Sequence, residues 1–223
     1  MIGRYERNTG TFTQTEQELL KTKKAVVVGC GGLGGYVAEL LARIGVGRLT
    51  LVDGDVFAVS NLNRQLNSLE TNLGKSKAFE TRERLLRIRS DLSVDAFNVF
   101  LDEENAGELM KGHDVVIDAL DNVKTRLLVE KTACELRIPL VHGAVKEWFA
   151  QICVVYPGDF TLSRLYPKDH AGERPSVPAF TPAFCASLEV SEAVKVLLKR
   201  ENVLKKKLLI ADLRINSFEL IDL

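Results

Sequence analysis

The sequence predicts an α/β fold, doubly wound, in which a mainly parallel sheet carries helices on both faces. Short β-branched runs alternate with segments whose apolar residues fall at helical spacing. A glycine-rich turn joins the first such run to the first long helix. Two apolar runs with a turn near Arg214 close the chain, and we expect them to extend the sheet as antiparallel strands.

The chain has 223 residues, which is enough for one large α/β domain. We expect a single domain over residues 1–223. It would comprise an N-terminal arm and helix at 1–22, a core at 23–145 and a C-terminal sheet extension at 146–223. Lys plus Arg number 30 and Asp plus Glu number 30, so the net charge is zero. This balance argues against binding of nucleic acid by bulk electrostatics.

The cysteines are scattered, and none forms a C-x-x-C pair. They are Cys30, Cys134, Cys153 and Cys185. Their spacing suggests neither a disulfide framework nor a structural zinc site. The N-terminus has no apolar leader segment, and no apolar run approaches membrane-spanning length. We therefore expect a cytoplasmic protein.

Helices and strands alternate through the first two thirds of the chain. We predict a helix at 13–22, strands at 25–28, 48–53, 94–99, 115–118 and 139–143, and helices at 34–44, 75–89, 103–110 and 123–136. Thr13 is the predicted N-cap of the first helix, and Gly45 ends the second. A polar loop at 55–71 shows little periodicity, and loops of this length inside a domain are usually functional or disordered.

The pattern changes after Gly143. A further strand is predicted at 151–156, and strands at 208–212 and 215–221 close the chain. Between them lies a long crossover loop at 157–182, which holds five of the six prolines. A helix is predicted at 183–199, and its apolar face is formed by Leu188, Val190, Ala193, Val194 and Leu197.

The turn between the first strand and its helix carries the clearest motif. Gly29, Gly31 and Gly34 fit the G-x-G-x-x-G dinucleotide pattern of Rossmann-like folds. Such a turn points free backbone N–H groups and a helix dipole at its occupant, which is typically a phosphate. Asp53 ends the next strand, where a carboxylate can bind a ribose. The sequence therefore predicts a nucleotide site.

Charged residues beyond the turn favour a triphosphate. A dehydrogenase needs the acidic ribose ligand and little further charge, whereas Arg64 and Lys77 supply two cations near the phosphate turn. Asp121 follows the fourth strand, at the carboxyl edge where ligands bind in open α/β sheets. A carboxylate at that edge can hold Mg²⁺ between phosphate oxygens.

These motifs resemble those of the ThiF/MoeB/HesA family, which is related to the ubiquitin-activating enzymes. The matching stretches cover residues 4–155 in the family's order. They are Arg4-Tyr5-Glu6-Arg7, Gly29-Cys30-Gly31-Gly32-Leu33-Gly34, Asp53-Gly54-Asp55, Ser60-Asn61-Leu62-Asn63-Arg64-Gln65, Gly74-Lys75-Ser76-Lys77, Asp121-Asn122 with Thr125-Arg126, and Gly143-Ala144 leading to Gln151-Ile152.

The resemblance implies an ATP-dependent adenylyltransferase. Such an enzyme uses ATP and Mg²⁺ to activate the C-terminal glycine of a ubiquitin-like sulfur-carrier protein. The glycine carboxylate attacks the α-phosphate, pyrophosphate leaves, and an acyl-adenylate remains. Because one anion attacks another, positive charge and positioning lower the barrier. The resemblance does not choose between thiamin, molybdopterin and cysteine pathways.

The resemblance also implies a set of site residues. Arg64, Lys77, Asp121 and Arg7 would be catalytic, and Asp121 would act through Mg²⁺. The nucleotide ligands would be Gly29, Gly31, Gly32, Gly34, Asp53, Asp55, Asn61, Arg64, Gln65, Lys77, Asp121 and Asn122. Arg7 matches an arginine that reaches the ATP of the neighbouring subunit in this family, so a homodimer is expected.

The sequence departs from the family at two places. Many relatives bind a structural zinc through two C-x-x-C pairs, which this chain lacks, so we expect no zinc site. The crossover loop also lacks a transfer cysteine. Cys185 follows it and is interpreted as a buried structural thiol rather than a nucleophile. His113 and His142 are expected to be core or strand-end residues, and Asp118 is either a strand-end cap or a ligand.

Three other functions are weighed against this one. A tRNA-modifying dehydratase of the same superfamily would need a basic face, which the helix at 75–89 could provide. An NAD-dependent oxidoreductase would leave Arg64, Lys77 and Asp121 unexplained. A non-catalytic binding subunit would not need the full set of nucleotide residues.

Overall fold

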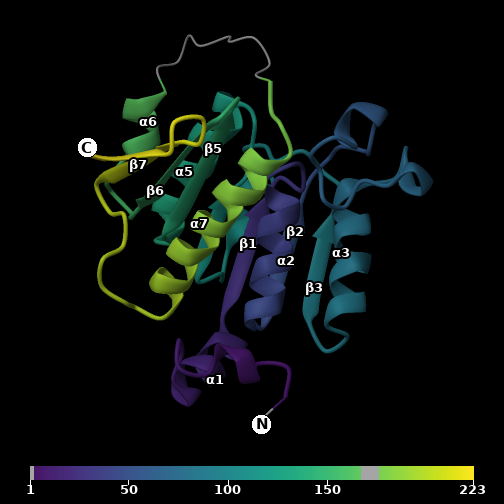
Figure 1. The fold of residues 1–223 in the computed structure, drawn as a ribbon, viewed down its shortest axis with the longest axis horizontal. Helices are drawn as coiled ribbons and strands as arrows, with labels where there is room; N and C mark the ends of the chain where they lie inside the picture. Colours follow the sequence, from purple (N-terminus) through teal and green to yellow (C-terminus); the bar gives the residue numbers. More distant parts are fainter. Residues whose placement is uncertain (1–2, 167–175) are drawn as a thin grey trace.

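The computed structural model describes residues 3–166 and 176–223, and these residues form a sheet enclosed between helices (Figure 1). The strand order in the sheet is β3-β2-β1-β4-β5-β6-β7-β8. Residues 167–175, in the predicted crossover loop at 157–182, lie outside the described residues.

The first five strands are parallel, and the last three continue the sheet antiparallel. The strands are β1 (Lys24–Val28), β2 (Arg48–Val52), β3 (Ser93–Phe97), β4 (Val115–Asp118), β5 (Leu140–Lys146), β6 (Phe149–Val155), β7 (Lys207–Asp212) and β8 (Ser217–Asp222). The predicted fold class is confirmed. Because the strand order reverses direction at the pair formed by β1 and β4, a ligand crevice is expected at their carboxyl ends.

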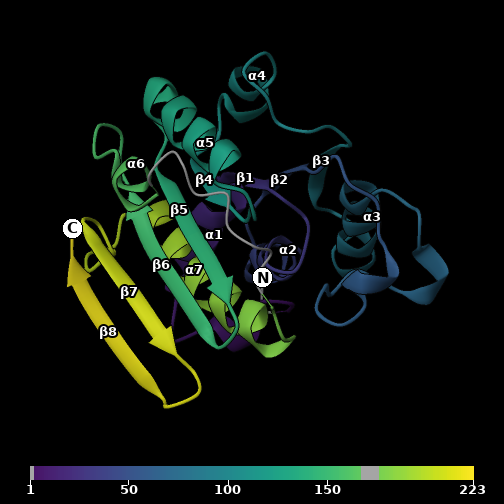
Figure 2. The same cartoon turned by 90° about the horizontal axis from the view of Figure 1, so that it is seen from above.

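Helices cover both faces of the sheet, and each face has its own apolar core. One face carries α2 (Gly34–Ile44), α3 (Lys77–Ile88) and α7 (Phe180–Leu197), and the other carries α4 (Ala106–Met110), α5 (Val123–Leu136) and α6 (Thr161–Leu165) (Figure 2). Val27 packs into the first core, whereas Val26 and Val28 pack into the second. The central strands are apolar on both faces for this reason.

Local signals set several element ends as predicted. Thr13 begins α1 (Gln14–Thr22) with a capping box, because its side chain accepts from the Glu16 N–H while Glu16 accepts from the Thr13 N–H. Gly45 ends α2 with a φ of 108°. Helix α5 has the predicted bounds, and the Asn122 side chain caps it by accepting from the Thr125 N–H.

Other boundaries differ from the predictions. Helix α3 starts at Lys77 rather than 75, because Ser76 is its N-cap. The segment at 157–182 is not entirely loop, since it contains α6 and the start of α7. Helix α7 begins three residues earlier than the predicted 183, and Pro182 is tolerated because it lies in the first turn, where no backbone donor is required.

The polar loop at 55–71 also contains local structure that periodicity did not reveal. It includes short 3₁₀ turns at Val59–Asn61 and Glu70–Asn72. Each turn is closed by a buried asparagine. Asn61 accepts from the Ala58 N–H, and Asn72 accepts from the Leu69 N–H. The predicted strand at 139–143 extends as β5 to Lys146, where a two-residue turn leads into β6.

Within residues 3–166 and 176–223, no helix is both long enough and apolar enough to cross a membrane.

Candidate functional site

The glycine turn lies where β1 ends and α2 begins, and it is tightly packed. A Cβ at Gly34 would lie 1.8 Å from the Gly29 carbonyl oxygen, and a Cβ at Gly29 would lie 2.6 Å from the Ala119 carbonyl oxygen. Gly29 also has a φ of 95°, which side-chain-bearing residues rarely adopt. These two glycines therefore allow the start of α2 to approach both the turn and the end of β4.

Two side chains from the polar loop lie over the other two glycines. A Cβ at Gly31 would lie 3.4 Å from Gln65 Nε2, and one at Gly32 would lie 3.5 Å from Arg64 Cγ. Gln65 is buried, and its Oε1 has no hydrogen-bond partner among the described residues. The Arg64 guanidinium donates to the Ser60 carbonyl at 3.0 Å and to Asn63 Oδ1 at 2.9 Å. The loop thus brings a cation to the glycine turn.

Asp53 connects the turn to the end of β2. Its Oδ2 accepts from the Cys30 N–H at 2.7 Å, and its Oδ1 accepts from the Asp55 N–H at 2.8 Å. Burial raises the pKa of this carboxyl, although both hydrogen bonds oppose that change. Asp53 therefore orders the loop itself, in the position where a ribose ligand is predicted.

Lys77 lies beside Asp53 at the start of α3. Its side chain is buried, and Nζ forms an ion pair with Asp55 Oδ2 at 2.9 Å. The Asp55 side chain is 56% exposed, so it covers the ammonium from the solvent side. The structure thus brings both predicted cations, Arg64 and Lys77, to the carboxyl edge of β1 and β2.

Asp121 lies at the same edge, two residues beyond the Ala119 that contacts Gly29. It is exposed, and its carboxylate has no hydrogen bond or ion pair among the described residues. Asn122 uses its side-chain oxygen as the cap of α5. Asn61 likewise uses its side-chain oxygen inside its own turn. The side chains of these two asparagines therefore have structural roles that their place in the motif did not indicate.

Arg7 is not brought to this site within one chain. It lies in the turn Glu6–Asn8 and is exposed. The neighbouring Tyr5 ring lies against Gly45, at the C-terminal end of α2. The glycine turn lies at the opposite end of this 11-residue helix, which is about 16 Å long. Figure 1 shows the N-terminal arm at the end of the sheet away from the turn.

Sequence reasoning missed a set of buried polar groups behind the site. Asp118 is fully buried and accepts from the Leu120 N–H at 3.1 Å, as expected of a strand-end cap. It also faces His142 Nδ1 at 2.7 Å. Arg126, from the matched Thr125-Arg126 stretch, has its Nε 3.6 Å from the Asp118 carboxylate. His113 contacts Thr50 and the Met110 carbonyl, away from this group.

Cys185 is fully buried, as expected of a structural thiol. Burial raises its pKa well above the ordinary range, which disfavours the nucleophilic thiolate. Among the described residues, no three His, Cys, Asp or Glu side chains are grouped to hold a metal. The absence of zinc from the protein stays a prediction.

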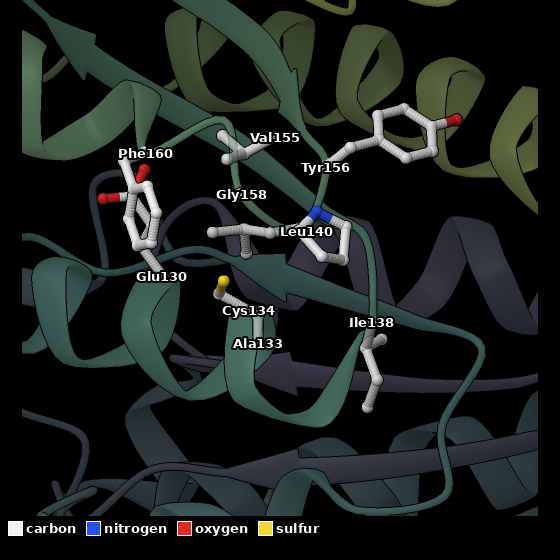
Figure 3. Close-up of a pocket in the computed structure, with 10 residues that line it drawn as sticks. Glu130, Ala133, Cys134, Ile138, Leu140, Val155, Tyr156, Gly158 and Phe160 are labelled. Atoms are coloured by element: carbon white, nitrogen blue, oxygen red, sulfur yellow. The ribbon is translucent and has the colours of Figure 1, made fainter.

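A small hollow lies at the opposite edge of the sheet from the glycine turn. It is formed where the second half of α5 meets the start of β5 and the end of β6, and its volume of about 10 Å³ matches a single water molecule (Figure 3). The labelled side chains around it include Cys134, Leu140 and Val155.

Comparisons with known proteins give one consistent result. Residues 5–223 match the ThiF family. The SAMP-activating enzyme E1 of Haloferax volcanii is 34% identical over 211 residues, which cover 91% of this chain and 77% of the relative. The sulfur carrier protein adenylyltransferase of Thermus thermophilus is 38% identical over 214 residues, which cover 91% of this chain and 79% of the relative.

A more distant structure shares the fold. The crystal structure of E. coli MccB with ATP superposes with a TM-score of 0.86 at 22% identity, over 99% of this chain and 71% of that one. At this identity, the likeness concerns the fold alone.

Proposed function

The chain belongs to the ThiF family, and we propose that it is an ATP-dependent adenylyltransferase that activates the C-terminal glycine of a ubiquitin-like sulfur-carrier protein. Two relatives that match over most of their length are named as a SAMP-activating enzyme and a sulfur carrier protein adenylyltransferase. The single structural observation that best supports the proposal is that Arg64 lies over Gly32 in the glycine turn. Lys77 and Asp121 lie at the same carboxyl edge of the sheet.

The chemistry of the site residues suits a nucleoside triphosphate. The turn supplies backbone N–H groups, and Gly31 and Gly32 leave space beneath Gln65 and Arg64 that a side chain would reduce. In the proposed reaction, a glycine carboxylate oxygen forms a bond to the α-phosphorus, and the bond to the pyrophosphate oxygen breaks. Arg64 and Lys77 would stabilise the charge on the phosphates while the two anions approach.

Asp121 is the proposed Mg²⁺ ligand. Its carboxylate is exposed and has no partner among the described residues, so its oxygens are available to a hard cation. When bound, Mg²⁺ would neutralise phosphate charge and orient the leaving pyrophosphate. Asp55 is proposed to hold Lys77 in place, and Asp53 to bind the ribose with the lone pairs that its backbone contacts leave free.

The tRNA-type acceptor has less support. Four basic residues of the segment at 75–89 are paired with acidic ones, which reduces the charge available for a phosphate backbone. The pairs are Lys75 with Glu80, Arg82 with Glu83, Arg84 with Glu39, and Arg89 with Asp91. The oxidoreductase alternative leaves the two cations at the turn without a role, so we do not favour it.

The test is ATP–pyrophosphate exchange, measured with and without small proteins that end in Gly-Gly and come from the same cell. We expect exchange that depends on one such protein. Asp121→Asn should lower its rate at least 100-fold, since one catalytic electrostatic contact is worth roughly that factor. Because Asp121 is exposed and unpaired, the melting temperature should change little.

The matched control is Glu103→Gln, which neutralises another exposed carboxylate without affecting the turn. It should leave exchange unchanged. Carrier-independent ATP binding with no exchange would reject the proposed reaction. Full exchange by Asp121→Asn would reject the role given to Asp121.

A further inference from the structure

A row of hydrogen-bonded polar side chains runs beneath the candidate site, across β4, β5 and β6. Asp118 and His142 are direct neighbours in the parallel register of β4 and β5, and both are fully buried. His142 Nδ1 lies 2.7 Å from Asp118 Oδ2, and His142 Nε2 lies 3.0 Å from the Tyr166 hydroxyl. We call Asp118, His142 and Tyr166 the polar triad. Gln151, on β6, donates to the same hydroxyl.

The hydrogen bonds of the polar triad all donate in one direction, toward Asp118. Burial lowers the pKa of His142, although Asp118 opposes the change, so the imidazole is neutral near pH 7. Burial raises the pKa of Tyr166 to about 12, so the phenol keeps its proton. Gln151 then donates to Tyr166, Tyr166 donates to His142 Nε2, and His142 Nδ1–H donates to the Asp118 carboxylate.

The polar triad ends at the backbone that carries Asp121. Asp118 Oδ1 accepts from the Leu120 N–H at 3.1 Å, and the Arg126 guanidinium donates to the Leu120 carbonyl. Arg126 also lies over the Tyr166 ring, 5.2 Å from its centroid. Asp118 therefore holds the N–H of Leu120, and Arg126 holds its carbonyl. Asp121 is the next residue. Among the described residues, the exposed Asp121 carboxylate has no hydrogen bond or ion pair that would fix it.

We propose that Asp118, His142 and Tyr166 are positioning residues that fix the Leu120 backbone and thereby aim Asp121 at the nucleotide. The inference rests on the proposed function, because it assigns the polar triad to the same site. Its physical basis is directionality. An apolar core at this place would fill the space equally well, whereas a satisfied row of hydrogen bonds imposes one geometry on the loop. Displacement of a catalytic group by about 1 Å can lower a rate by about 100-fold.

The main test is Tyr166→Phe, which removes one hydroxyl and keeps the ring beneath Arg126. We expect the kcat of carrier-dependent exchange to fall about 10- to 100-fold, with the KM for ATP within about twofold. The matched control is Tyr156→Phe, because the Tyr156 hydroxyl has no hydrogen bond among the described residues. That variant should keep wild-type kcat. Equal kcat values for the two variants would overturn the proposal.

Two variants of His142 separate positioning from simple loss of packing. His142→Asn can still donate to Asp118 but cannot accept from Tyr166, whereas His142→Leu loses both bonds. We expect His142→Asn to keep more activity than His142→Leu. Its effect should also be non-additive with Tyr166→Phe, because both changes break the same link. Equal losses in the two His142 variants, or full additivity, would contradict a linear arrangement that acts through Asp118.

A measurement on the unmodified protein separates this inference from the proposed reaction. The chain has three histidines, so ¹⁵N NMR can follow His142, with His142→Asn identifying its signals. We expect a neutral Nδ1–H tautomer whose signals shift when ATP and Mg²⁺ are added. A different tautomer, or signals unaffected by bound ATP, would overturn the positioning role. If no carrier supports exchange but ATP still shifts His142, the proposed reaction fails and the coupling of the polar triad to the nucleotide site stands.

Discussion

At the residue scale, Glu189 is a carboxylic acid buried within the core. It lies in the middle of α7, it is fully buried, and neither of its carboxylate oxygens has a hydrogen-bond partner among the described residues. A Cβ at Gly143 would lie 2.6 Å from its carboxyl carbon, so the absence of a side chain on β5 makes room for it. Burial raises the pKa of Glu189 well above its ordinary range, and Asp118 adds to the increase.

This pKa shift predicts a specific pH dependence of stability. Below about pH 4.5 both the folded and unfolded states hold the proton, so Glu189 contributes no pH dependence. As the pH rises, the unfolded state ionises while the folded state stays protonated. The free energy of unfolding therefore falls by about 1.4 kcal/mol per pH unit until the folded pKa is reached. Glu189→Gln cannot ionise and should lose this slope.

Urea unfolding at pH 5 and pH 8 measures the effect. The decrease between the two pH values should be smaller in Glu189→Gln than in the wild type by more than about 1 kcal/mol. Glu135→Gln, an exposed carboxylate on α5, should behave like the wild type. Parallel pH profiles for the wild type and Glu189→Gln would show that Glu189 is ionised in the folded state.

At the element scale, the short helix α6 depends on one buried side chain from α5. Glu130 accepts from the Leu162 N–H at 2.6 Å, from the Ser163 N–H at 2.9 Å and from the Ser163 hydroxyl. A five-residue helix is too short to be stable by itself. The carboxylate supplies the acceptors that its first turn needs, and it does so across 32 residues of sequence.

We therefore predict that Glu130→Ala destabilises the protein by roughly 2–4 kcal/mol, since it leaves several donors without an acceptor in a buried place. Denaturant unfolding measures the loss, and hydrogen exchange should show faster exchange of the Leu162 and Ser163 amides. Glu135→Ala lies five residues further along α5 and is exposed, so it should change stability by less than about 0.5 kcal/mol. Unchanged protection of α6 in Glu130→Ala would mean that packing alone holds it.

At the scale of the whole molecule, Arg7 is separated from the proposed site by the length of α2. The arm that carries it lies at the C-terminal end of α2, and the glycine turn lies at the other end. An arginine at this place can act on a nucleotide only in a second copy of the chain. The homodimer expected from the family resemblance would then hold two shared sites related by a twofold axis.

Mixing two inactive variants tests this arrangement. If Arg7→Ala and Asp121→Asn each abolish exchange, an equal mixture should recover about one quarter of the wild-type rate. Half of the randomly assorted dimers would be mixed, and each mixed dimer would rebuild one of its two sites. Either variant mixed with itself is the control and should stay inactive. No recovery after subunit exchange would place both residues at one site within a single chain. Full exchange by Arg7→Ala alone would assign Arg7 no role.

The sequence by itself was enough to predict the alternation of strands and helices, the glycine turn and most element ends. These features depend on signals that lie within a few residues of one another, such as the capping box of Thr13 and the left-handed Gly45. The strand pattern also predicted that Arg64, Lys77 and Asp121 lie at one edge of the sheet. The reason is that the carboxyl ends of parallel strands share that edge.

Only the tertiary structure decided the contacts between residues far apart in the chain. Asp118 meets His142 because β4 and β5 are neighbours in register, and Glu130 reaches α6 because both lie on the same face of the sheet. No local pattern carries that information, since a buried polar side chain and an exposed one look alike until a partner is known. The separation of Arg7 from the turn has the same origin, because the length and direction of α2 place them at its opposite ends.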